Sequence, residues 1–378
     1  MSINPETLNE QATSSLFDNA MRAIDLGREG GNEGLPMGFE RLVQYVPNLQ
    51  RGTYYLMVAG TGVGKTACTD QAFMYEPFEY LMNLGEDTDI ELDIDYFSFE
   101  IDSSVKITKG ISRRLYQKYG IIADVNLILS KGKNRISQEI YDLVLEQRIY
   151  FEELEKRLHV FDMPENPTGV NKYLRAKSAR HGKEHYKEVD TVDDAGQPCK
   201  RTVFSHYVPN NPKRYHLAIV DHASLSKQEK GMNVQDTIIK LSGYFTQWRN
   251  NYQGIPVLVQ QLNFDQFSSD RAKLKKVTPT LGDLGDSKYT GRDCNVCMSL
   301  FSPMALELPK FMEGPGHNGY NINRMQDSFR SLEILKGRDG GIGTRIGLQY
   351  VGAAGVFKEL PPPAHMTEAD YKRVAELK

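Results

Sequence analysis

The sequence YYLMVAGTGVGKTACT, residues 54–69, predicts the central feature of this protein. It starts with an uninterrupted apolar run, YYLMV, which predicts a buried strand. A glycine-rich turn follows, in which Gly60, Gly62 and Gly64 allow backbone conformations that a Cβ atom would forbid. Successive N–H groups of such a turn can point inward at phosphate oxygens. The order of strand, glycine-rich turn and helix therefore predicts a phosphate-binding loop (P-loop).

The residues after this turn complete a nucleotide-binding motif. Residues 59–66 match the pattern G-x-x-x-x-G-K-[ST], except that Ala59 stands where the pattern has glycine. In this motif Lys65 reaches the β- and γ-phosphates, the Thr66 hydroxyl binds Mg²⁺, and the helix N-terminus adds its positive dipole end. A chance glycine-rich turn beside a Lys-Thr pair is the alternative, which the flanking strand and helix disfavour. The expected nucleotide contacts are Ala59, Gly60, Thr61, Gly62, Val63, Gly64, Lys65, Thr66 and Ala67.

Length, composition and charge limit the remaining possibilities. The chain has 378 residues, of which 40% are hydrophobic and 25% charged, so we expect one large globular domain with appendages. A net charge of −3 gives no general attraction to nucleic acid, so any such contact must come from local basic patches. The sequence lacks an apolar run of about 18 residues and its N-terminus is polar, so we expect neither a membrane span nor a secretory signal. We therefore expect the protein in the cytoplasm.

The cysteines predict no disulfide framework in a chain of this length. Cys294 and Cys297 have the C-x-x-C spacing of a redox pair or a zinc half-site, but they lead into the apolar stretch MSLF. We interpret them as buried thiols at the start of a strand and expect no structural zinc.

Three later strands end in polar residues that suit phosphate chemistry. Glu100 follows the strand DIDYFSF, and ligands of open α/β sheets bind beyond the carboxyl ends of the strands. There Glu100 could polarise an attacking water, although an exposed glutamate at a strand end is the alternative. Asp221 follows the strand YHLAIV and could hold Mg²⁺ through its water shell. Gln261 lies at the polar end of IPVLVQQL, where a glutamine can sense the γ-phosphate or the attacking water.

Segments outside these strands add further expectations. Apolar residues at helical spacing predict an amphipathic helix at 5–27, which packs either on its own domain or on a neighbouring subunit. Alternating residues around a turn at 183–212 predict an inserted surface β-hairpin, whose function the sequence does not indicate. The glycine-rich segment 303–328 predicts a loop with little regular structure, and residues 367–377 predict a short terminal helix.

Two groups of cations are candidates for ligand contacts. The loop 263–280 combines basic residues with two phenylalanines, a composition that can follow single-stranded nucleic acid, although charged loops are commonly only solvated. Lys336 and Arg338 lie at a strand end that points away from their own P-loop, which suits a finger reaching a neighbour's γ-phosphate. The basic residues of the loop are Arg271, Lys273, Lys275 and Lys276.

In this order, the motifs resemble the C-terminal ATPase domain of DnaB-type replicative helicases, which are hexameric motors of the RecA-like fold. The resemblance covers residues 35–360, apart from the hairpin. It implies an α/β fold with helices flanking a mostly parallel twisted sheet, preceded by a linker-type helix and joint (1–34) and followed by a tail helix (361–378). The matching motifs are AGTGVGKT at 59–66, YFSFE at 96–100, LAIVDH at 217–222, VQQLN at 259–263, PTLGDLGDS at 279–287 and EILKGRDGGIGT at 333–344.

The resemblance implies a role for each residue of the nucleotide site. Lys65 and Thr66 would bind ATP and Mg²⁺, and Asp221 would be the metal-associated acid. Glu100 resembles the catalytic base, and Gln261 resembles the sensor that couples hydrolysis to DNA contact.

The resemblance also implies partners. Lys336 and Arg338 resemble the pair that completes a neighbouring subunit's site. The implied protein is an ATP-dependent DNA helicase that moves along single-stranded DNA as a homo-hexamer, with a primase or a loader as a further partner.

The chain departs from the family pattern in three places. One helix precedes the motor where the family has a helical N-terminal domain that contacts primase, so the chain resembles a phage-encoded motor without that domain, and primase coupling is in question. Gln260 replaces the serine before the sensor glutamine. Gly285 replaces an arginine of the DNA-binding loop, so DNA contact is expected to have shifted to Lys288 or to the basic loop.

Two other functions stay open at this point. A RecA- or RadA-like recombination ATPase would use the same fold but would form filaments and exchange strands. A nucleotide-binding scaffold with slow hydrolysis would have no need for a finger such as Arg338.

Overall fold

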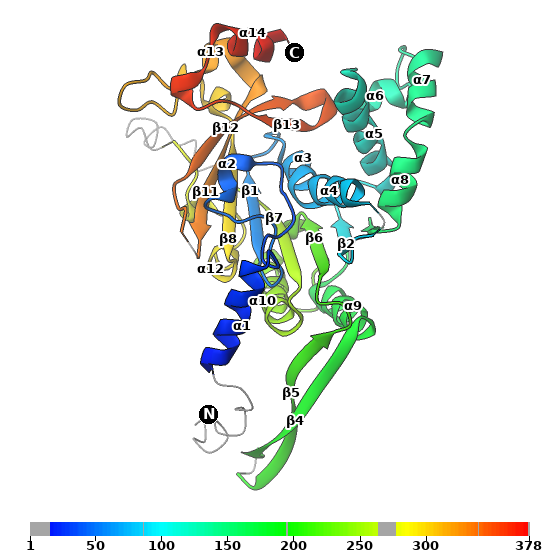
Figure 1. Cartoon of the computed structure of the whole chain (residues 1–378), viewed down its shortest axis with the longest axis vertical. Helices are drawn as coiled ribbons and strands as arrows, with labels where there is room; N and C mark the ends of the chain where they lie inside the picture. The colour runs from blue at the N-terminus through cyan, green and yellow to red at the C-terminus, as the bar shows by residue number, and fades with distance from the viewer. Residues whose placement is uncertain (1–15, 86, 194–195, 264–276, 339, 377–378) are drawn as a thin grey trace.

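One large twisted sheet forms the centre of the protein (Figure 1). We describe it from a computed structural model, which covers residues 16–85, 87–193, 196–263, 277–338 and 340–376. Within these residues the sheet has nine strands in the order β13-β12-β11-β8-β1-β7-β6-β2-β3. From β8 to β3 neighbouring strands are parallel, whereas β11, β12 and β13 add an antiparallel edge. The strands are β1 (Tyr55–Ala59), β2 (Glu91–Ser98), β3 (Leu158–Phe161), β6 (Arg214–Asp221), β7 (Ile255–Gln261), β8 (Val296–Phe301), β11 (Phe329–Gly337), β12 (Arg345–Val351) and β13 (Val356–Glu359).

Helices cover both faces of this sheet because its central strands are apolar on both sides. Along β1, Tyr55 and Met57 pack into a cluster with the P-loop helix, and Leu56 and Val58 pack on the opposite face. The first face is covered by α3 (Lys65–Asp70), α4 (Glu76–Leu84) and α8 (Arg148–Glu155), and the second by α9 (Pro167–Arg180) and α10 (Val234–Tyr252). The remaining helices between β2 and β3 are α5 (Ser103–Tyr119), α6 (Val125–Ile128) and α7 (Gln138–Leu145).

The helix after the P-loop is interrupted close to where a kink at Pro77 is expected. Residues 71–75 form a π-helical turn between α3 and α4, and Pro77 lies in the first turn of α4. Proline is tolerated at that position because the first N–H groups of a helix have no partner within it. The wider turn, which precedes the proline, is the irregularity that the structure shows.

The prediction of an inserted hairpin is confirmed. Strands β4 (Gly182–Val192) and β5 (Pro198–Pro209) pair antiparallel and extend away from the body of the protein, beside α1 (Leu16–Arg28) in the view of Figure 1. The base of the hairpin is anchored, since Phe204 and Tyr207 pack against Tyr252 of α10. Of the helix predicted at 5–27, the part before residue 16 lies outside the described residues.

The prediction of a loop at 303–328 was wrong in part. This segment contains a two-stranded sheet of β9 (Lys310–Phe311) and β10 (Tyr320–Asn321), the helix α13 (Ile322–Met325) and two 3-10 turns. Its aromatic residues, Phe311 and Tyr320, form a separate apolar cluster with Tyr371 of the terminal helix α14 (Glu368–Glu376). The many glycines concealed these anchors in the sequence. Among the described helices, all are too short or too polar to span a lipid bilayer.

Candidate nucleotide-binding site

The P-loop between β1 and α3 has the shape that its glycines require. Gly62 and Gly64 have positive φ angles of 74° and 101°, and Gly64 is the N-cap of α3. A Cβ atom at Gly64 would lie 3.0 Å from the ring of Tyr350 and 3.1 Å from the ring of Phe357. These two rings stack on each other at 4.4 Å in the β12–β13 hairpin. Glycine is therefore needed at this position for its backbone conformation and for its lack of a side chain.

Replacing Gly64 by alanine is expected to weaken nucleotide binding by about tenfold or more. A left-handed conformation costs a non-glycine residue roughly 1–3 kcal/mol, and the added methyl group would also push on Tyr350 and Phe357. Titration with a fluorescent nucleotide measures the affinity. Gly62→Ala is the matched control, because its Cβ atom would meet nothing within 4 Å. Equal losses in the two variants would contradict the role given to the aromatic pair.

A buried arginine supports the loop from below, and sequence reasoning missed it. Arg330 of β11 donates from Nε to the carbonyl of Val63 at 2.8 Å and from Nη1 to the carbonyl of Asp327 at 2.6 Å. Its guanidinium also lies 5.0 Å from the ring centre of Tyr350. Burial lowers the pKa of Arg330 and Asp327 opposes that shift. Arg330 thus ties the P-loop to the antiparallel edge of the sheet.

The carboxylates predicted to assist hydrolysis lie close to the P-loop lysine. Burial lowers the pKa of Lys65, and the negative charges of Asp221 and Glu100 oppose that shift. The structure therefore brings together these three residues from the ends of β1, β2 and β6. Asp221 is buried, whereas Glu100 is exposed at the end of its strand, where water can reach it.

Asp221 has the properties of a residue that waits for a cation. Its Oδ2 atom accepts a hydrogen bond from the Tyr96 hydroxyl at 3.3 Å. Its Oδ1 atom is buried and has no hydrogen-bond partner within the described part of the chain. An unpaired buried carboxylate oxygen is costly, and Mg²⁺ with its water shell would satisfy it. Together with the Thr66 hydroxyl on α3, Asp221 fits a magnesium ion bound to a nucleotide.

The sensor glutamine also lies at the P-loop. Gln261, the last residue of β7, donates from Nε2 to the Thr61 hydroxyl at 2.5 Å. β7 is the direct neighbour of β1, so the end of β7 lies beside the loop. This contact joins the predicted sensor to one of the predicted nucleotide contacts.

Lys336 and Arg338 lie at the opposite edge of the sheet. β11 runs antiparallel to β8, and Gly337 pairs with Val296 at the start of β8, which pairs with Tyr55 at the start of β1. The P-loop lies at the other end of β1, four residue steps of about 3.3 Å away, or roughly 13 Å. The side chain of Arg338 is exposed. The ammonium of Lys336 donates to the carbonyls of Gly291 and Arg292 at 2.9 and 2.6 Å.

The candidate DNA-contact residues divide into two groups. Lys288 is exposed at the start of α12 (Tyr289–Asp293). The loop cations Arg271, Lys273, Lys275 and Lys276 lie outside the described residues, so their role stays a prediction.

Comparison with solved structures gives the fold a name. The chain superposes on the isolated ATPase domain of a DnaB-like helicase with a TM-score of 0.63 and 15% sequence identity, covering 92% of this chain and 100% of that chain. It superposes on a DnaB-like replicative helicase, described with its interactions with primase, with a TM-score of 0.62 and 14% identity, covering 92% of this chain and 67% of that chain. The chain has the fold of a DnaB-like helicase ATPase domain. No family model matches the sequence, and neither does any curated protein.

The expected RecA-like P-loop fold is thereby confirmed, and the DnaB-like fold explains where the sequence departs from the family pattern. Gln260, which replaces a serine, is buried, and its amide donates to the carbonyls of Gly285 and Ser287 and accepts from the Thr290 hydroxyl. It fixes the turn that follows the DNA-loop motif. A Cβ atom at Gly285 would lie 2.8 Å from the carbonyl of Gln261, so this turn has no room for an arginine.

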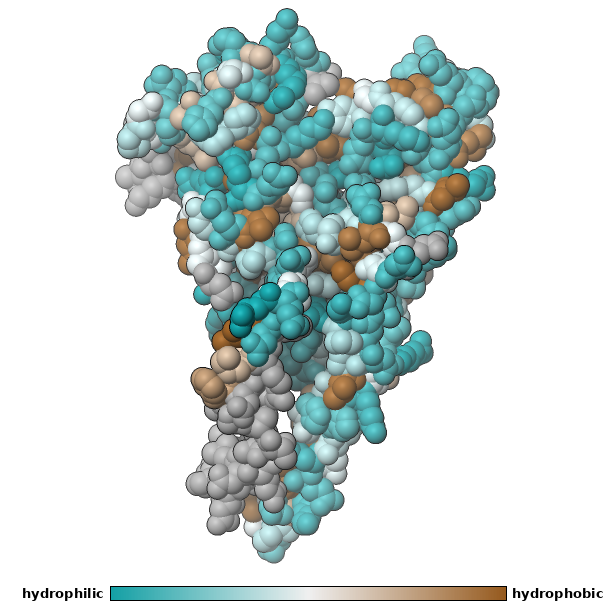
Figure 2. All heavy atoms as spheres, viewed as in Figure 1, coloured by the Kyte–Doolittle hydropathy of each residue, from teal (hydrophilic) through white to brown (hydrophobic). Residues whose placement is uncertain are grey.

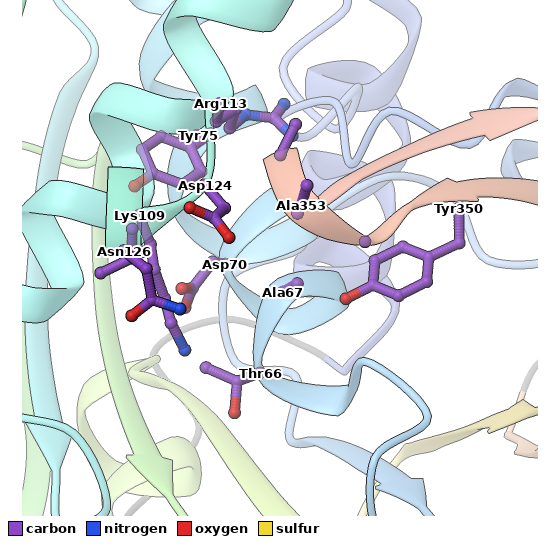
Figure 3. Close-up of a pocket in the computed structure, with 14 residues that line it drawn as sticks. Thr66, Ala67, Asp70, Tyr75, Lys109, Arg113, Asp124, Asn126, Tyr350 and Ala353 are labelled. Atoms are coloured by element: carbon purple, nitrogen blue, oxygen red, sulfur yellow. The ribbon is translucent and has the colours of Figure 1, made fainter. Parts of the chain in front are cut away.

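A cavity of about 230 Å³ lies beside the P-loop helix of this DnaB-like fold (Figure 3). Thr66 and Asp70 of α3 face Asp124 and Asn126 across it, and the hydroxyl of Tyr350 points in from the β12–β13 hairpin. The cavity is thus continuous with the residues that would hold the phosphates. No local pattern in the sequence indicated this cavity, because three distant segments form its wall.

Two other clusters do not bind metal in this arrangement. Asp93, Asp95 and His159 bring three possible ligand atoms within 4.8 Å of one another, but the ammonium of Lys177 donates to both carboxylates at 2.6 and 2.7 Å. That ammonium takes the place a cation would occupy. Cys294 and Cys297 are both buried free thiols, as predicted.

Proposed function

We propose that this protein is an ATP-dependent motor that moves along single-stranded DNA as a ring of identical subunits, a DnaB-like helicase. The observation that carries the proposal is the division of the hydrolytic groups. Lys65, Glu100 and Asp221 converge at the P-loop edge of the sheet, whereas Arg338 is exposed at the opposite edge. A subunit arranged in this way has an incomplete site and a spare cation, and a neighbouring copy would supply what each lacks.

The proposed chemistry is attack of water on the γ-phosphate of ATP. Glu100 would accept a proton from the attacking water, and Lys65 would neutralise charge on the β- and γ-phosphates. Thr66 and Asp221 would hold Mg²⁺, which neutralises the developing charge between the phosphates. Gln261 would report the state of the γ-phosphate. The cavity at Tyr350 would take the adenosine part of the nucleotide.

The exposed surface of α1 supports a ring. Phe17, Met21 and Ile24 lie at helical spacing and are exposed, with 71% of Phe17 and 53% of Ile24 accessible (Figure 2). Apolar side chains in such a stripe favour contact with another protein surface. We propose that this stripe docks on the adjacent subunit of the ring, which would be a hexamer.

DNA contact would come from Lys288 and the loop cations. The larger partner of such a cytoplasmic motor would be a primase or a loader, as the DnaB-like helicase of the comparison interacts with primase.

The proposal predicts that single-stranded DNA stimulates ATP hydrolysis and that the active species is a hexamer. Turnover with and without DNA is measured beside molar mass by light scattering, and a strand-displacement assay tests unwinding. A filament with strand exchange and no unwinding would instead indicate a recombination ATPase. A monomer whose slow hydrolysis ignores DNA would overturn the proposal in favour of a scaffold.

A further inference from the structure

Beneath the proposed metal site lies a buried ion pair that the function described above does not use. Lys106 of α5 is 1% exposed, and its ammonium donates to both carboxylate oxygens of Asp70 on α3, at 2.9 and 3.1 Å. The same ammonium lies 3.5 Å from the ring centre of Tyr96 on β2. Burying such a pair is on average no more stabilising than apolar packing of the same volume. Stability alone therefore does not account for it.

The hydroxyl of Tyr96 connects this pair to Asp221. It lies 2.7 Å from Oδ1 of Asp70 and 3.3 Å from Oδ2 of Asp221. A tyrosine hydroxyl has one proton, so two carboxylates compete for it. The ammonium of Lys106 satisfies Asp70 from the other side, which reduces the demand of Asp70 for that proton. Tyr96 is fully buried, so it has no water to turn to instead.

We propose that Lys106, Asp70 and Tyr96 are positioning residues for the magnesium site. Asp70 and Lys106 hold the Tyr96 hydroxyl against Oδ2 of Asp221, which leaves Oδ1 for the water shell of the ion. This inference rests on the proposed role of Asp221 as the metal-associated acid. Partners that orient a metal-binding carboxylate commonly change metal affinity or activity about 10- to 100-fold when they are removed.

The network also connects the elements that carry the other hydrolytic groups. Asp70 lies on the helix of Lys65 and Thr66, and Tyr96 lies on the strand that precedes Glu100. Lys106 lies in the first half of α5, which begins directly after Glu100. A single set of contacts therefore sets the spacing between the P-loop helix, the strand of the catalytic base and the metal-associated acid.

Tyr96→Phe tests the proposal by removing one oxygen atom while keeping the ring. Nucleotide affinity is titrated at a series of Mg²⁺ concentrations, and kcat and KM are measured in parallel. We expect the Mg²⁺ concentration for half-maximal nucleotide binding to rise about tenfold and kcat to fall by a similar factor. Binding without Mg²⁺ is expected to stay unchanged, a split that mere loosening of the fold would not produce.

Tyr173→Phe is the matched control. The Tyr173 hydroxyl donates to another carboxylate of β2, Asp95, at 2.9 Å. Asp95 bonds to Lys177 and His216 instead of to the P-loop helix, so wild-type Mg²⁺ dependence is expected.

A second variant covers the case in which Tyr96→Phe does not fold. The neutral pair Asp70→Asn with Lys106→Gln is then used, and the same Mg²⁺ shift is expected. A Mg²⁺ dependence equal to that of wild type would overturn the positioning role and leave the proposed function intact. An unmodified protein that neither binds nor hydrolyses Mg²⁺-ATP would overturn both.

Discussion

Alanine at position 338 is expected to reduce ATP hydrolysis by about 10³- to 10⁵-fold while nucleotide affinity stays close to that of wild type. Arg338 is exposed and lies at the far edge of the sheet from its own P-loop, so its loss removes no contact to the nucleotide of its own subunit. The guanidinium would instead stabilise charge on a neighbour's γ-phosphate during cleavage. Steady-state turnover and nucleotide titration measure the two effects separately.

Mixing experiments make this expectation sharper. A 1:1 mixture of Arg338→Ala and Glu100→Ala chains is expected to regain part of the activity, because some interfaces then join an intact Glu100 to an intact Arg338. Arg373→Ala is the control for loss of a positive charge, since Arg373 lies on α14 and pairs with Asp370. A mixture as inactive as its two components would contradict a site shared between subunits.

The second large effect is on stability. Lys106→Met is expected to lower the free energy of unfolding by about 3–5 kcal/mol, because it leaves the Asp70 carboxylate buried without its cation. Urea unfolding followed by circular dichroism measures the change. The apolar double variant Asp70→Leu with Lys106→Met is expected to recover most of the loss, because it removes both charges.

A surface pair provides the comparison for this result. Lys213 and Asp89 are 2.8 Å apart, as close as the buried pair, but both side chains are more than half exposed. Lys213→Met is therefore expected to change stability little. If Lys106→Met were as stable as wild type, the ammonium would not be needed to hold Asp70 in the interior, and the network would lose its physical basis.

The parts of the site that could be predicted from the sequence are those that local pattern encodes. The P-loop combines an apolar strand, a glycine turn and a Lys-Thr pair within a few residues. Glu100, Asp221 and Gln261 each follow an apolar strand, and parallel strands bring their carboxyl ends to one edge. The structure places all of these together, as expected.

The parts that could not be predicted depend on contacts between distant segments. Arg330 bonds to Val63, which is 267 positions away, and in sequence it is one arginine within an apolar strand. Asp70 and Lys106 lie on helices, where charged residues usually face water, and only the packing of α5 on α3 buries them. In the segment 303–328, the glycines indicated a loop, although the aromatic residues between them form a core.

The strands of the sheet also set how this protein can convert chemical energy into movement. The P-loop and Arg338 are attached to opposite ends of the same hydrogen-bonded strands, and a sheet paired on both sides stretches very little. The separation between the two groups in one subunit is therefore nearly constant through a cycle of turnover. The compliance that a cycle needs must reside in the joints between copies, so the step along a polymer track would equal the travel allowed at one such joint.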